Sequence, residues 1–310
     1  MPTSRSACAA PDPLRRAPVQ TSGPGLRGLR RAAAWDDGCV ETTTFAATDG
    51  FPHPALIGVT DADRTLAIQG DPHQVLPLAS VTKPLTAWGA LVAIDHGLLD
   101  FDDPAGPEGS TVLHLLDHTS GLPFEGEDPQ RAPGERRIYS NAGFDLLAGV
   151  VAEAAGMPFA EWMAREVVAP LGMTETDVTG RPSAGARSSV TDLLVFGREV
   201  LRPTLIPAEL RDLALRVSRQ GLPGLVPGYG TYPDNQWGLG FERKGAKSPH
   251  WLADSFPPET AGHFGAQGSF LFIDRSRDLA AAFLSGVPFG EDHKRIWPAL
   301  TEEIAARYGG

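Results

Sequence analysis

The chain has 310 residues, of which 42% are hydrophobic and 21% charged, the composition of a soluble globular protein with enough length for a large buried core. Its net charge of −11 argues against nucleic acid as a partner, because phosphate binding needs a positive surface. No apolar run approaches the roughly 18 residues that cross a membrane, and the two cysteines, Cys8 and Cys39, indicate no disulfide framework.

The first residues differ in composition from the rest of the chain. Residues 1–44 are rich in Pro, Ala, Arg and Gly without periodicity. They predict a disordered N-terminal extension, or an assigned start upstream of the true one, before a single domain of residues 45–310. Arg15-Arg16 and Arg30-Arg31 resemble part of an export signal, but neither pair is followed by a sufficient apolar stretch. We therefore expect a cytoplasmic protein.

In chain order, the predicted elements begin with a β-hairpin. Residues 55–59 and 65–69 are short apolar runs on either side of a polar turn. A helix is expected from Ser80 to His96, because its apolar residues recur on one helical face, and Gly97 can cap its end.

The middle of the domain, about residues 100–215, is predicted to be mainly helical. Residues that favour helix ends bound these segments, with Ser110 before the first, Gly156 after the second and Ser189 before the last. The predicted helices are 110–118, 141–155, 159–168 and 189–201. Residues 216–236 carry Gly and Pro throughout and are expected to form a long surface loop.

Strands return at the end of the chain. Residues 269–273 and 279–285 flank a polar turn and predict a second hairpin, and residues 292–307 predict a closing helix. Strands thus precede and follow a helical block, without the strict alternation of a parallel sheet. The predicted fold class is α+β: an antiparallel sheet formed from both chain ends and flanked by helices, with an inserted, mainly helical lobe at about 100–215.

Three groups of residues have the types and spacing that catalysis requires, and the first is Ser80-x-x-Lys83. Residues three apart share a helix face, so the Lys83 amine can reach the Ser80 hydroxyl, which is a weak nucleophile until a base takes its proton. Lysine is a base only when neutral, so its pKa must fall from about 10.4. Pro84 places the helix start close to Ser80, where the positive end of the helix dipole helps to stabilise an oxyanion.

This spacing alone is a weak indicator of catalysis. The chain has 16 Ser and four Lys against 23 Arg, so roughly 0.2 such pairs are expected by chance. The scarcity of lysine adds weight to Lys83, because arginine cannot give up its proton. The alternative is a surface lysine that follows a capping serine.

The second group is Tyr139-Ser140-Asn141, which opens a predicted helix after a polar loop. A tyrosine can pass a proton between a serine and a leaving group. Asn141 can donate to a substrate carbonyl or hold Lys83. The alternative is that Asn141 only caps the helix while Tyr139 packs beneath the loop.

The third group is His263-Phe264-Gly265, which Ala266 follows at the start of a predicted strand. Gly265 would let a substrate approach the backbone closely, and N–H groups at this edge can complete an oxyanion hole. His263 and these two small residues are therefore candidates for substrate binding. The alternative is a structural histidine.

Together, and in this order, the three groups resemble the serine β-lactamase and DD-peptidase superfamily, whose pattern is Ser-x-x-Lys, Tyr-x-Asn and Lys/His-x-Gly. The resemblance is closest to the class C-like branch of β-lactamase-related serine hydrolases, which includes esterases, DD-peptidases, D-amino-acid amidases and acyl-transferases. It covers roughly residues 50–305, and segments 113–123, 170–173 and 237–241 also resemble that family.

The resemblance implies a role for each matching residue. Ser80 would be acylated, and Lys83 would activate it. Tyr139 would share the base role and later activate the attacking water, while Asn141 would orient the substrate or Lys83. The backbone N–H groups of Ser80 and Ala266 would form the oxyanion hole.

His263 is a departure from the pattern of the antibiotic-hydrolysing class C enzymes that these motifs resemble, which have a lysine at this position. Histidine is mostly neutral at pH 7, which weakens recognition of a substrate carboxylate and favours esters or amides over penicillins. We predict a serine hydrolase of the esterase, peptidase or amidase type, acting through an acyl-enzyme on a small-molecule ester, amide or peptide, with weak β-lactamase activity as a further option. The alternatives are an acyl-transferase of natural-product metabolism and a non-catalytic ligand-binding relative.

No cofactor and no metal is expected. His114 and His118 lie four apart on a predicted helix, but no acid or cysteine cluster accompanies them, so a structural role is favoured. The absence of a Gly-x-Ser-x-Gly elbow argues against an α/β-hydrolase. The oligomeric state is left open by the sequence.

Overall fold

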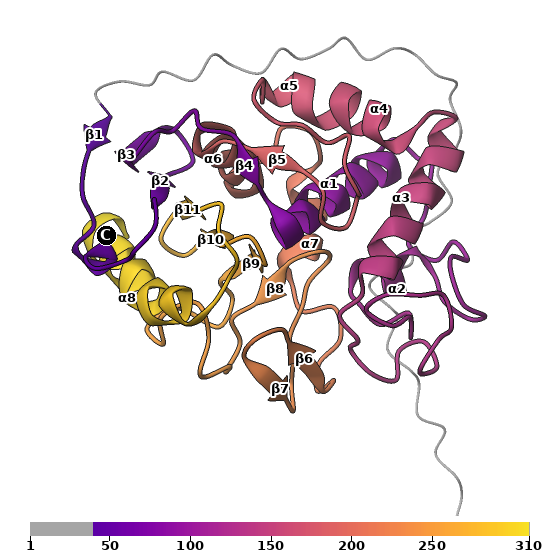
Figure 1. Cartoon of the computed structure of the whole chain (residues 1–310). Coiled ribbons are helices and arrows are strands. Elements are labelled where there is room, and N and C mark those ends of the chain that lie inside the picture. Colours follow the sequence, from indigo (N-terminus) through magenta and orange to yellow (C-terminus); the bar gives the residue numbers. More distant parts are fainter. Residues whose placement is uncertain (1–39, 310) are drawn as a thin grey trace, which may run out of the picture. The chain divides into compact units, whose positions relative to one another are not determined.

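A seven-stranded sheet forms the centre of the described part of the chain, residues 40–309 of the computed structural model (Figure 1). The strands lie in the order β1-β3-β2-β11-β10-β9-β8, so strands from the two ends of the domain are neighbours. Their bounds are β1 Glu41–Thr42, β2 Leu56–Thr60, β3 Thr65–Gln69, β8 Glu242–Arg243, β9 Ala261–Gly265, β10 Ser269–Asp274 and β11 Leu279–Leu284. The α+β fold class is confirmed.

Both predicted hairpins are present in this sheet. β2 pairs antiparallel with β3, β10 pairs antiparallel with β11, and β11 pairs antiparallel with β2, which joins the chain ends. The sheet departs from the prediction at one edge, where β1 runs parallel to β3. β1 falls within the segment predicted as an extension, and residues 1–39 of that segment, with both cysteines, lie outside the described residues.

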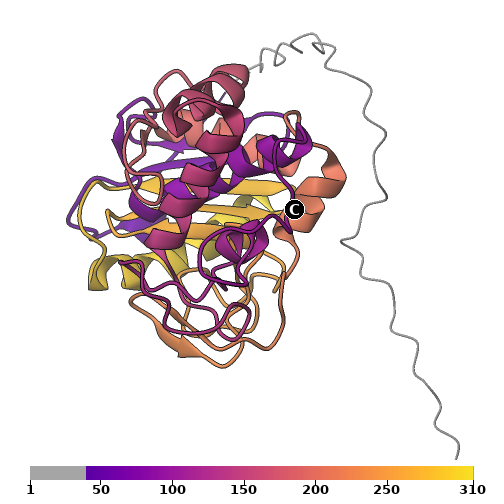
Figure 2. The same ribbon diagram turned by 90° about the vertical axis from the view of Figure 1, so that its right-hand side faces the viewer.

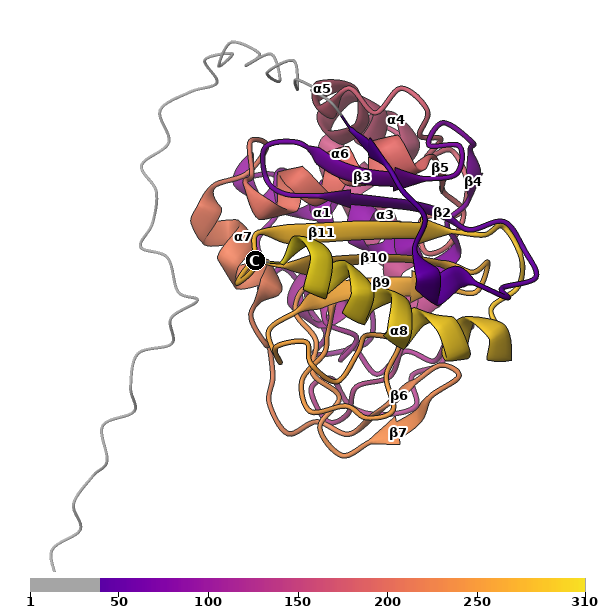
Figure 3. The same cartoon turned by 90° about the vertical axis from the view of Figure 1, so that its left-hand side faces the viewer.

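The central strands face two hydrophobic cores, because successive side chains of a strand point to opposite faces. On β10, Phe270 and Phe272 belong to one core, and Leu271 and Ile273 belong to the other. Figure 3 shows the helix α8, Glu291–Tyr308, across the near face of the sheet, with α1 and α6 behind it. The helix predicted at the end of the chain therefore packs against the core that contains Phe270 and Phe272.

The helix α6, Val190–Leu201, lies directly against the other face of the sheet. A Cβ atom at Gly58 of β2 would lie 2.4 Å from the Val190 side chain, so glycine leaves the room that this close packing needs. The predicted N-cap is present, because the Ser189 hydroxyl accepts a hydrogen bond of 3.2 Å from the Asp192 N–H.

The remaining helices follow the predicted order, with three differences, the first of which is α7, a helix that was not predicted. Their bounds are α1 Thr82–Asp95, α2 Val112–Leu116, α3 Asn141–Ala155, α4 Phe159–Met163, α5 Ala169–Leu171 and α7 Ala208–Leu215. The helix predicted at 110–118 is shorter, because Thr111 rather than Ser110 caps it and forms a capping box with His114. The helix predicted at 159–168 continues past α4 through a π-helical turn, Ala164–Val168, into α5.

The segment predicted as a loop, residues 216–236, contains a small hairpin of β6, Gly224–Val226, and β7, Gly230–Tyr232. Figure 2 shows this hairpin and the loop that precedes α3 gathered at one end of the domain. Arg137 of that loop forms a parallel bridge with Gly224 of the hairpin, so the two segments are in contact. β4, Leu76–Pro77, and β5, Arg187–Ser188, form another short pair elsewhere.

No single helix within residues 40–309 is long and apolar enough to cross a membrane. Length and composition would suffice only for the pair formed by α3 and the following stretch Phe159–Leu171 taken together, and these are bent by 78° at their junction.

Candidate active site

Ser80 lies in a 3₁₀ turn, Ala79–Val81, immediately before α1. Ala79 has φ of 44°, in the left-handed region that residues with a Cβ atom avoid, so the backbone beside Ser80 is strained. The Ser269 hydroxyl donates a hydrogen bond of 2.7 Å to the Leu78 carbonyl. This bond ties the turn to β10, so Ser80 is positioned by the sheet as well as by α1.

The Lys83 side chain is fully buried beside Ser80. Its Nζ lies 3.3 Å from Ser80 Oγ. It also donates to Asn141 Oδ1 at 2.6 Å and to the Ser183 carbonyl at 2.9 Å. The structure therefore brings together Ser80, Lys83 and Asn141, and it adds the Ser183 carbonyl, a contact that sequence reasoning missed.

Burial lowers the pKa of Lys83 from 10.5 to about 7. The Asp145 carboxylate opposes this shift, the Arg181 guanidinium adds to it, and the Glu125 carboxylate opposes it again. A large fraction of the amine is therefore neutral at pH 7, as a base for Ser80 must be.

Tyr139, in the loop before α3, lies close to the Lys83 amine. Lys83 Nζ lies 4.6 Å from the centre of the Tyr139 ring. Burial raises the pKa of the Tyr139 hydroxyl above its ordinary value, and hydrogen bonding with Ser80 only partly opposes this shift. The phenol therefore keeps its proton at neutral pH, so Lys83 is the better base and Tyr139 is suited to carry a proton.

His263 lies on β9 behind Tyr139. Burial, with a contribution from Lys83, lowers the pKa of His263 to about 3, so the ring is neutral. Its Nδ1 lies 2.6 Å from the Phe264 carbonyl, which places the ring proton there. Nε2, 3.3 Å from the Tyr139 hydroxyl, is then an acceptor that orients this hydroxyl.

The end of β9 faces the Ser80 turn. A Cβ atom at Gly265 would lie 2.3 Å from the Leu78 carbonyl oxygen and 3.1 Å from the Ser80 nitrogen. The missing side chain thus makes room for the chain's own turn, a role of Gly265 that the sequence did not suggest. Within residues 40–309, neither Ser80 N–H nor Ala266 N–H donates a hydrogen bond to the protein, so both are available for an oxyanion.

A cavity of about 140 Å³ opens beside Ser80. Its walls include Tyr139, His263 and Ala266, all predicted site residues, together with Trp237. The cavity is large enough for part of an acyl group and is walled mostly by apolar and aromatic side chains, as small-molecule sites usually are.

A buried carboxylate that the sequence did not single out, Glu242, also lines this cavity. It pairs with Lys247 at 3.3 Å and lies 3.2 Å from His250 Nε2, and Trp251 Nε1 donates to it at 2.9 Å. Burial would raise the pKa of Glu242, but Lys247 and His250 outweigh burial and lower the pKa below its usual range. None of these three partners lines the cavity, and together they hold Glu242 as a negative charge in its wall.

A second set of charged residues supports Asn141 from the side away from Lys83. Glu125 Oε1 accepts a hydrogen bond of 2.8 Å from Asn141 Nδ2, which fixes the amide so that its oxygen faces Lys83. Arg181 pairs with Glu125 and also with Asp145, at 2.5 and 2.6 Å. Hydrogen bonds from Arg181 and Asn141 lower the pKa of Glu125 to about 2. Glu125 is therefore a candidate positioning residue.

Replacing Glu125 by alanine should lower the rate of Ser80 acylation about tenfold, because Asn141 loses the acceptor that orients it. Loss of the Glu125 charge also lowers the pKa of Lys83, so the acidic limb of the pH–rate profile should move to lower pH. Glu127→Gln is the matched control, since Glu127 is an exposed acid in the same loop. An unchanged rate and an unchanged acidic limb in Glu125→Ala would remove Glu125 from the site.

Among residues 40–309, no group of three or more His, Cys, Asp or Glu side chains is arranged to hold a metal ion. His114 Nδ1 lies 3.0 Å from the Thr111 hydroxyl in the cap of α2. His118 is buried, and its Nδ1 accepts a hydrogen bond of 3.1 Å from the Ser140 N–H. Both histidines therefore take part in local backbone structure.

The fold and these motifs match one protein family. A model of the Beta-lactamase family matches residues 31–305, which include every predicted site residue. The chain therefore belongs to the Beta-lactamase family, within the superfamily of serine β-lactamases and DD-peptidases that its motifs resemble.

Individual relatives agree with this assignment. A crystal structure titled as a β-lactamase from Mycobacterium bovis is 42% identical, with a TM-score of 0.84 over 85% of this chain and 98% of that one. A penicillin-binding protein of Bacillus subtilis (strain 168) is 32% identical over 188 residues, 49% of this chain and 41% of that protein. The D-alanyl-D-alanine-carboxypeptidase/endopeptidase AmpH of Escherichia coli (strain K12) is 30% identical over 155 residues, 38% of this chain and 40% of that protein. The chain thus spans about two fifths of the length of these curated relatives.

Proposed function

We propose that the protein is a serine hydrolase that forms an acyl-enzyme at Ser80 from an ester or amide. The observation that carries this proposal is the buried Lys83 amine, which lies 3.3 Å from Ser80 Oγ and whose pKa is lowered to about 7. A ligand-binding module has no need for a neutral lysine beside a serine, so the arrangement favours catalysis over simple binding.

In the acylation step, Ser80 Oγ attacks the substrate carbonyl carbon while Lys83 takes the hydroxyl proton. The carbonyl oxygen becomes an oxyanion between the N–H groups of Ser80 and Ala266. When the oxyanion collapses, the bond to the leaving oxygen or nitrogen breaks, and that atom receives a proton through Tyr139 or Lys83. The product is an ester between Ser80 and the acyl group, with an alcohol or amine released.

In the second step, a water molecule attacks the acyl-enzyme carbonyl and passes a proton to the Tyr139 and Lys83 pair. The bond to Ser80 Oγ then breaks, the serine recovers its proton, and a carboxylic acid leaves. An alcohol or amine in place of water would yield a new ester or amide by the same path. Hydrolysis and acyl transfer therefore differ only in the acceptor.

The charge of the site favours neutral esters or amides at the scissile bond over penicillins. The neutral His263 ring offers no cation to a carboxylate beside the reacting carbonyl. The names of two relatives, a penicillin-binding protein and a D-alanyl-D-alanine-carboxypeptidase/endopeptidase, make penicillins and D-Ala-D-Ala peptides the necessary comparison substrates.

Intact-mass spectrometry after mixing with p-nitrophenyl esters, penicillins and D-Ala-D-Ala peptides tests this proposal. We expect an acyl adduct from the p-nitrophenyl esters, mapped to Ser80 by peptide digestion, and no adduct in Ser80→Ala. Ser255→Ala, which changes an exposed serine, is the control and should keep the adduct. Full activity in Ser80→Ala, or no adduct with any substrate, would contradict the proposal. Chromatography of products formed with and without added alcohols distinguishes hydrolysis from acyl transfer.

A further inference from the structure

A larger hollow adjoins the cavity beside Ser80. It measures about 630 Å³ and shares Phe124, Tyr139 and Pro227 with the smaller cavity. We call it the distal groove; it is lined by residues between 124 and 139 of the loop before α3 and by Leu225 and Pro227 of the β6–β7 hairpin. The three shared residues place the distal groove next to the cavity that Ser80 lines.

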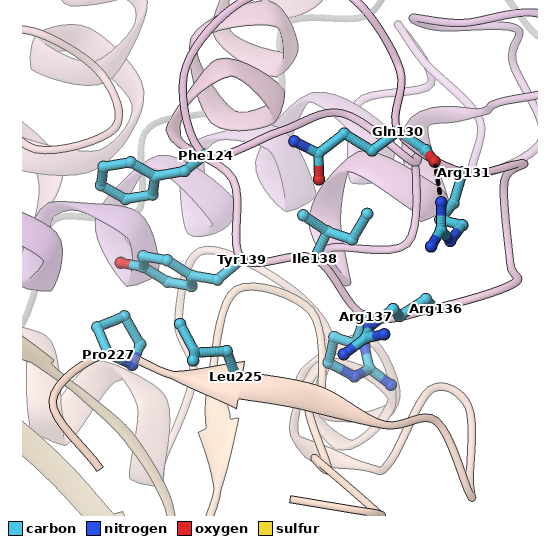
Figure 4. Close-up of a pocket in the computed structure, with 9 residues that line it drawn as sticks. All are labelled: Phe124, Gln130, Arg131, Arg136, Arg137, Ile138, Tyr139, Leu225 and Pro227. Atoms are coloured by element: carbon cyan, nitrogen blue, oxygen red, sulfur yellow. Dashed lines mark hydrogen bonds between the residues drawn. The ribbon is translucent and has the colours of Figure 1, made fainter. Parts of the chain in front are cut away.

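The two ends of the distal groove differ in chemistry. Figure 4 shows Phe124 and Tyr139 facing each other at one end, with Pro227 beside them, and Arg131 at the other end. The rings of Phe124 and Tyr139 are stacked, with centroids 5.9 Å apart. The end next to the cavity is therefore apolar, while the far end carries guanidinium groups.

Three arginines line the groove. Arg137 forms hydrogen bonds that stabilise the fold, and Arg131 is only weakly paired. The buried Arg137 donates to the Asp117 and Arg219 carbonyls. Arg131 is exposed, its Nη1 donates a hydrogen bond of 2.8 Å to the Gln130 carbonyl, and its Nε forms a surface ion pair of 3.6 Å with Glu135, a kind of contact that contributes little. Neither contact prevents Arg131 from turning to an anion in the groove.

Arg136 is the arginine that most clearly lacks a partner. It is half-buried, and within residues 40–309 no acid or acceptor pairs with its guanidinium. The chain has 38 acidic residues, yet none lies among the described residues that line the groove. A half-buried, unpaired guanidinium beside an apolar wall favours a planar anion that forms two parallel hydrogen bonds.

We propose that the distal groove binds a carboxylate, so that Ser80 acts preferentially on esters or amides whose acyl chain has an apolar segment ending in a carboxylate. The inference rests on the proposed function and adds its substrate class. The apolar segment lies against Phe124, Tyr139 and Leu225, and the carboxylate pairs with Arg136, supported by Arg131. Recognition of charge thus takes place away from the scissile bond.

Two esters with acyl chains of equal length test this proposal: mono-p-nitrophenyl adipate, which ends in a carboxylate, and p-nitrophenyl hexanoate, which ends in a methyl group. We expect kcat/KM for the adipate ester to exceed that for the hexanoate ester about tenfold at low ionic strength. Equal values in the wild type, or a preference for hexanoate, would overturn the proposal.

Arginine variants locate the effect. Arg136→Gln should lower the ratio of the two specificity constants about tenfold. Arg136→Lys should give a ratio between those of the wild type and Arg136→Gln, because an ammonium keeps the charge but not the planar geometry of a guanidinium. Arg216→Gln is the matched control, since Arg216 is an exposed arginine that does not line the groove. A ratio that changes equally in Arg136→Gln and Arg216→Gln would show a general effect of net charge and overturn the assignment.

Binding separates this proposal from the proposed function. Titration calorimetry of adipate with the wild-type chain should give a dissociation constant about tenfold lower than with Arg136→Gln. Adduct formation from the hexanoate ester, without a preference for the adipate ester, would contradict the proposed substrate class but not the proposed hydrolase activity. Binding of adipate that depends on Arg136, without adduct formation from either ester, would contradict the proposed hydrolase activity but not the proposed carboxylate site.

Discussion

Replacing Lys83 by arginine or by methionine is expected to lower the rate of Ser80 acylation about 10³-fold, with both variants nearly equal. Guanidinium keeps its proton at every working pH and a thioether takes none, so neither side chain can accept the Ser80 proton. Stopped-flow measurement of p-nitrophenol release in the first turnover reports this rate. Near-wild-type acylation in Lys83→Arg would contradict the role of Lys83 as the base.

The same prediction has a pH dependence. Only neutral Lys83 is a base, so wild-type acylation should rise with pH and level off above about 7 rather than above its ordinary value of 10.5. The residual rates of Lys83→Arg and Lys83→Met should lack this inflection. An inflection near 7 that persists in both variants would assign it to a different group.

Burial of Lys83 also affects stability, and this gives an independent check. Between pH 7 and 10.5 the folded protein has lost the Lys83 proton while the unfolded chain still holds it, so stability rises with pH across this window. Relative to Lys83→Met, the wild type should gain up to about 1.4 kcal/mol for each pH unit. Urea unfolding at several pH values measures the difference, with Lys294→Met as the control at a partly exposed lysine. A difference that does not vary with pH would mean that the pKa of Lys83 is not lowered.

Replacing Tyr139 by phenylalanine should lower turnover about 10²-fold, with deacylation slowed more than acylation. Lys83 still reaches Ser80 Oγ at 3.3 Å without the phenol, so the serine can be activated. The attacking water, in contrast, loses the hydroxyl that His263 orients. The variant should therefore release a rapid burst of p-nitrophenol and accumulate acyl-enzyme, which intact-mass spectrometry detects.

Tyr229→Phe is the matched control for this experiment. Tyr229 is another tyrosine near β9, with its ring 5.7 Å from that of Phe264. Its buried hydroxyl has no hydrogen-bond partner within residues 40–309, so its loss removes no hydrogen bond there. Equal turnover in Tyr139→Phe and Tyr229→Phe would remove Tyr139 from the proton path.

Most elements of the fold could be predicted because they depend on local patterns. The helix predicted at 141–155 has those bounds in the structure, since Ser140 caps one end and Gly156 takes the left-handed conformation at the other. The hairpin of β10 and β11 likewise follows from apolar runs on either side of a polar turn. The β6–β7 hairpin was missed because its three-residue strands are too short to show a period among Gly and Pro residues.

The candidate site was predictable only where its residues are near each other in the chain. Ser80 and Lys83 face each other because of helical spacing alone. The contact of Lys83 with the Ser183 carbonyl joins residues 100 apart, and that of Glu125 with Asn141 depends on the path of an irregular loop. The neutrality of His263 arises from burial by the surrounding chain, which no local pattern records.

Ser80 lies in the turn before α1, Lys83 in the first turn of α1 and His263 on β9, whereas the distal groove is made by a loop and a small hairpin at one end of the domain. Regular elements resist change, while loops tolerate insertion and substitution at little cost to the core. Divergence of this chain toward new acyl groups can therefore proceed by exchanging residues 126–138, which leaves Glu125 in place, or the β6–β7 hairpin. Chimeras that transplant those segments between family members would inherit selectivity from the donor and reactivity from the recipient.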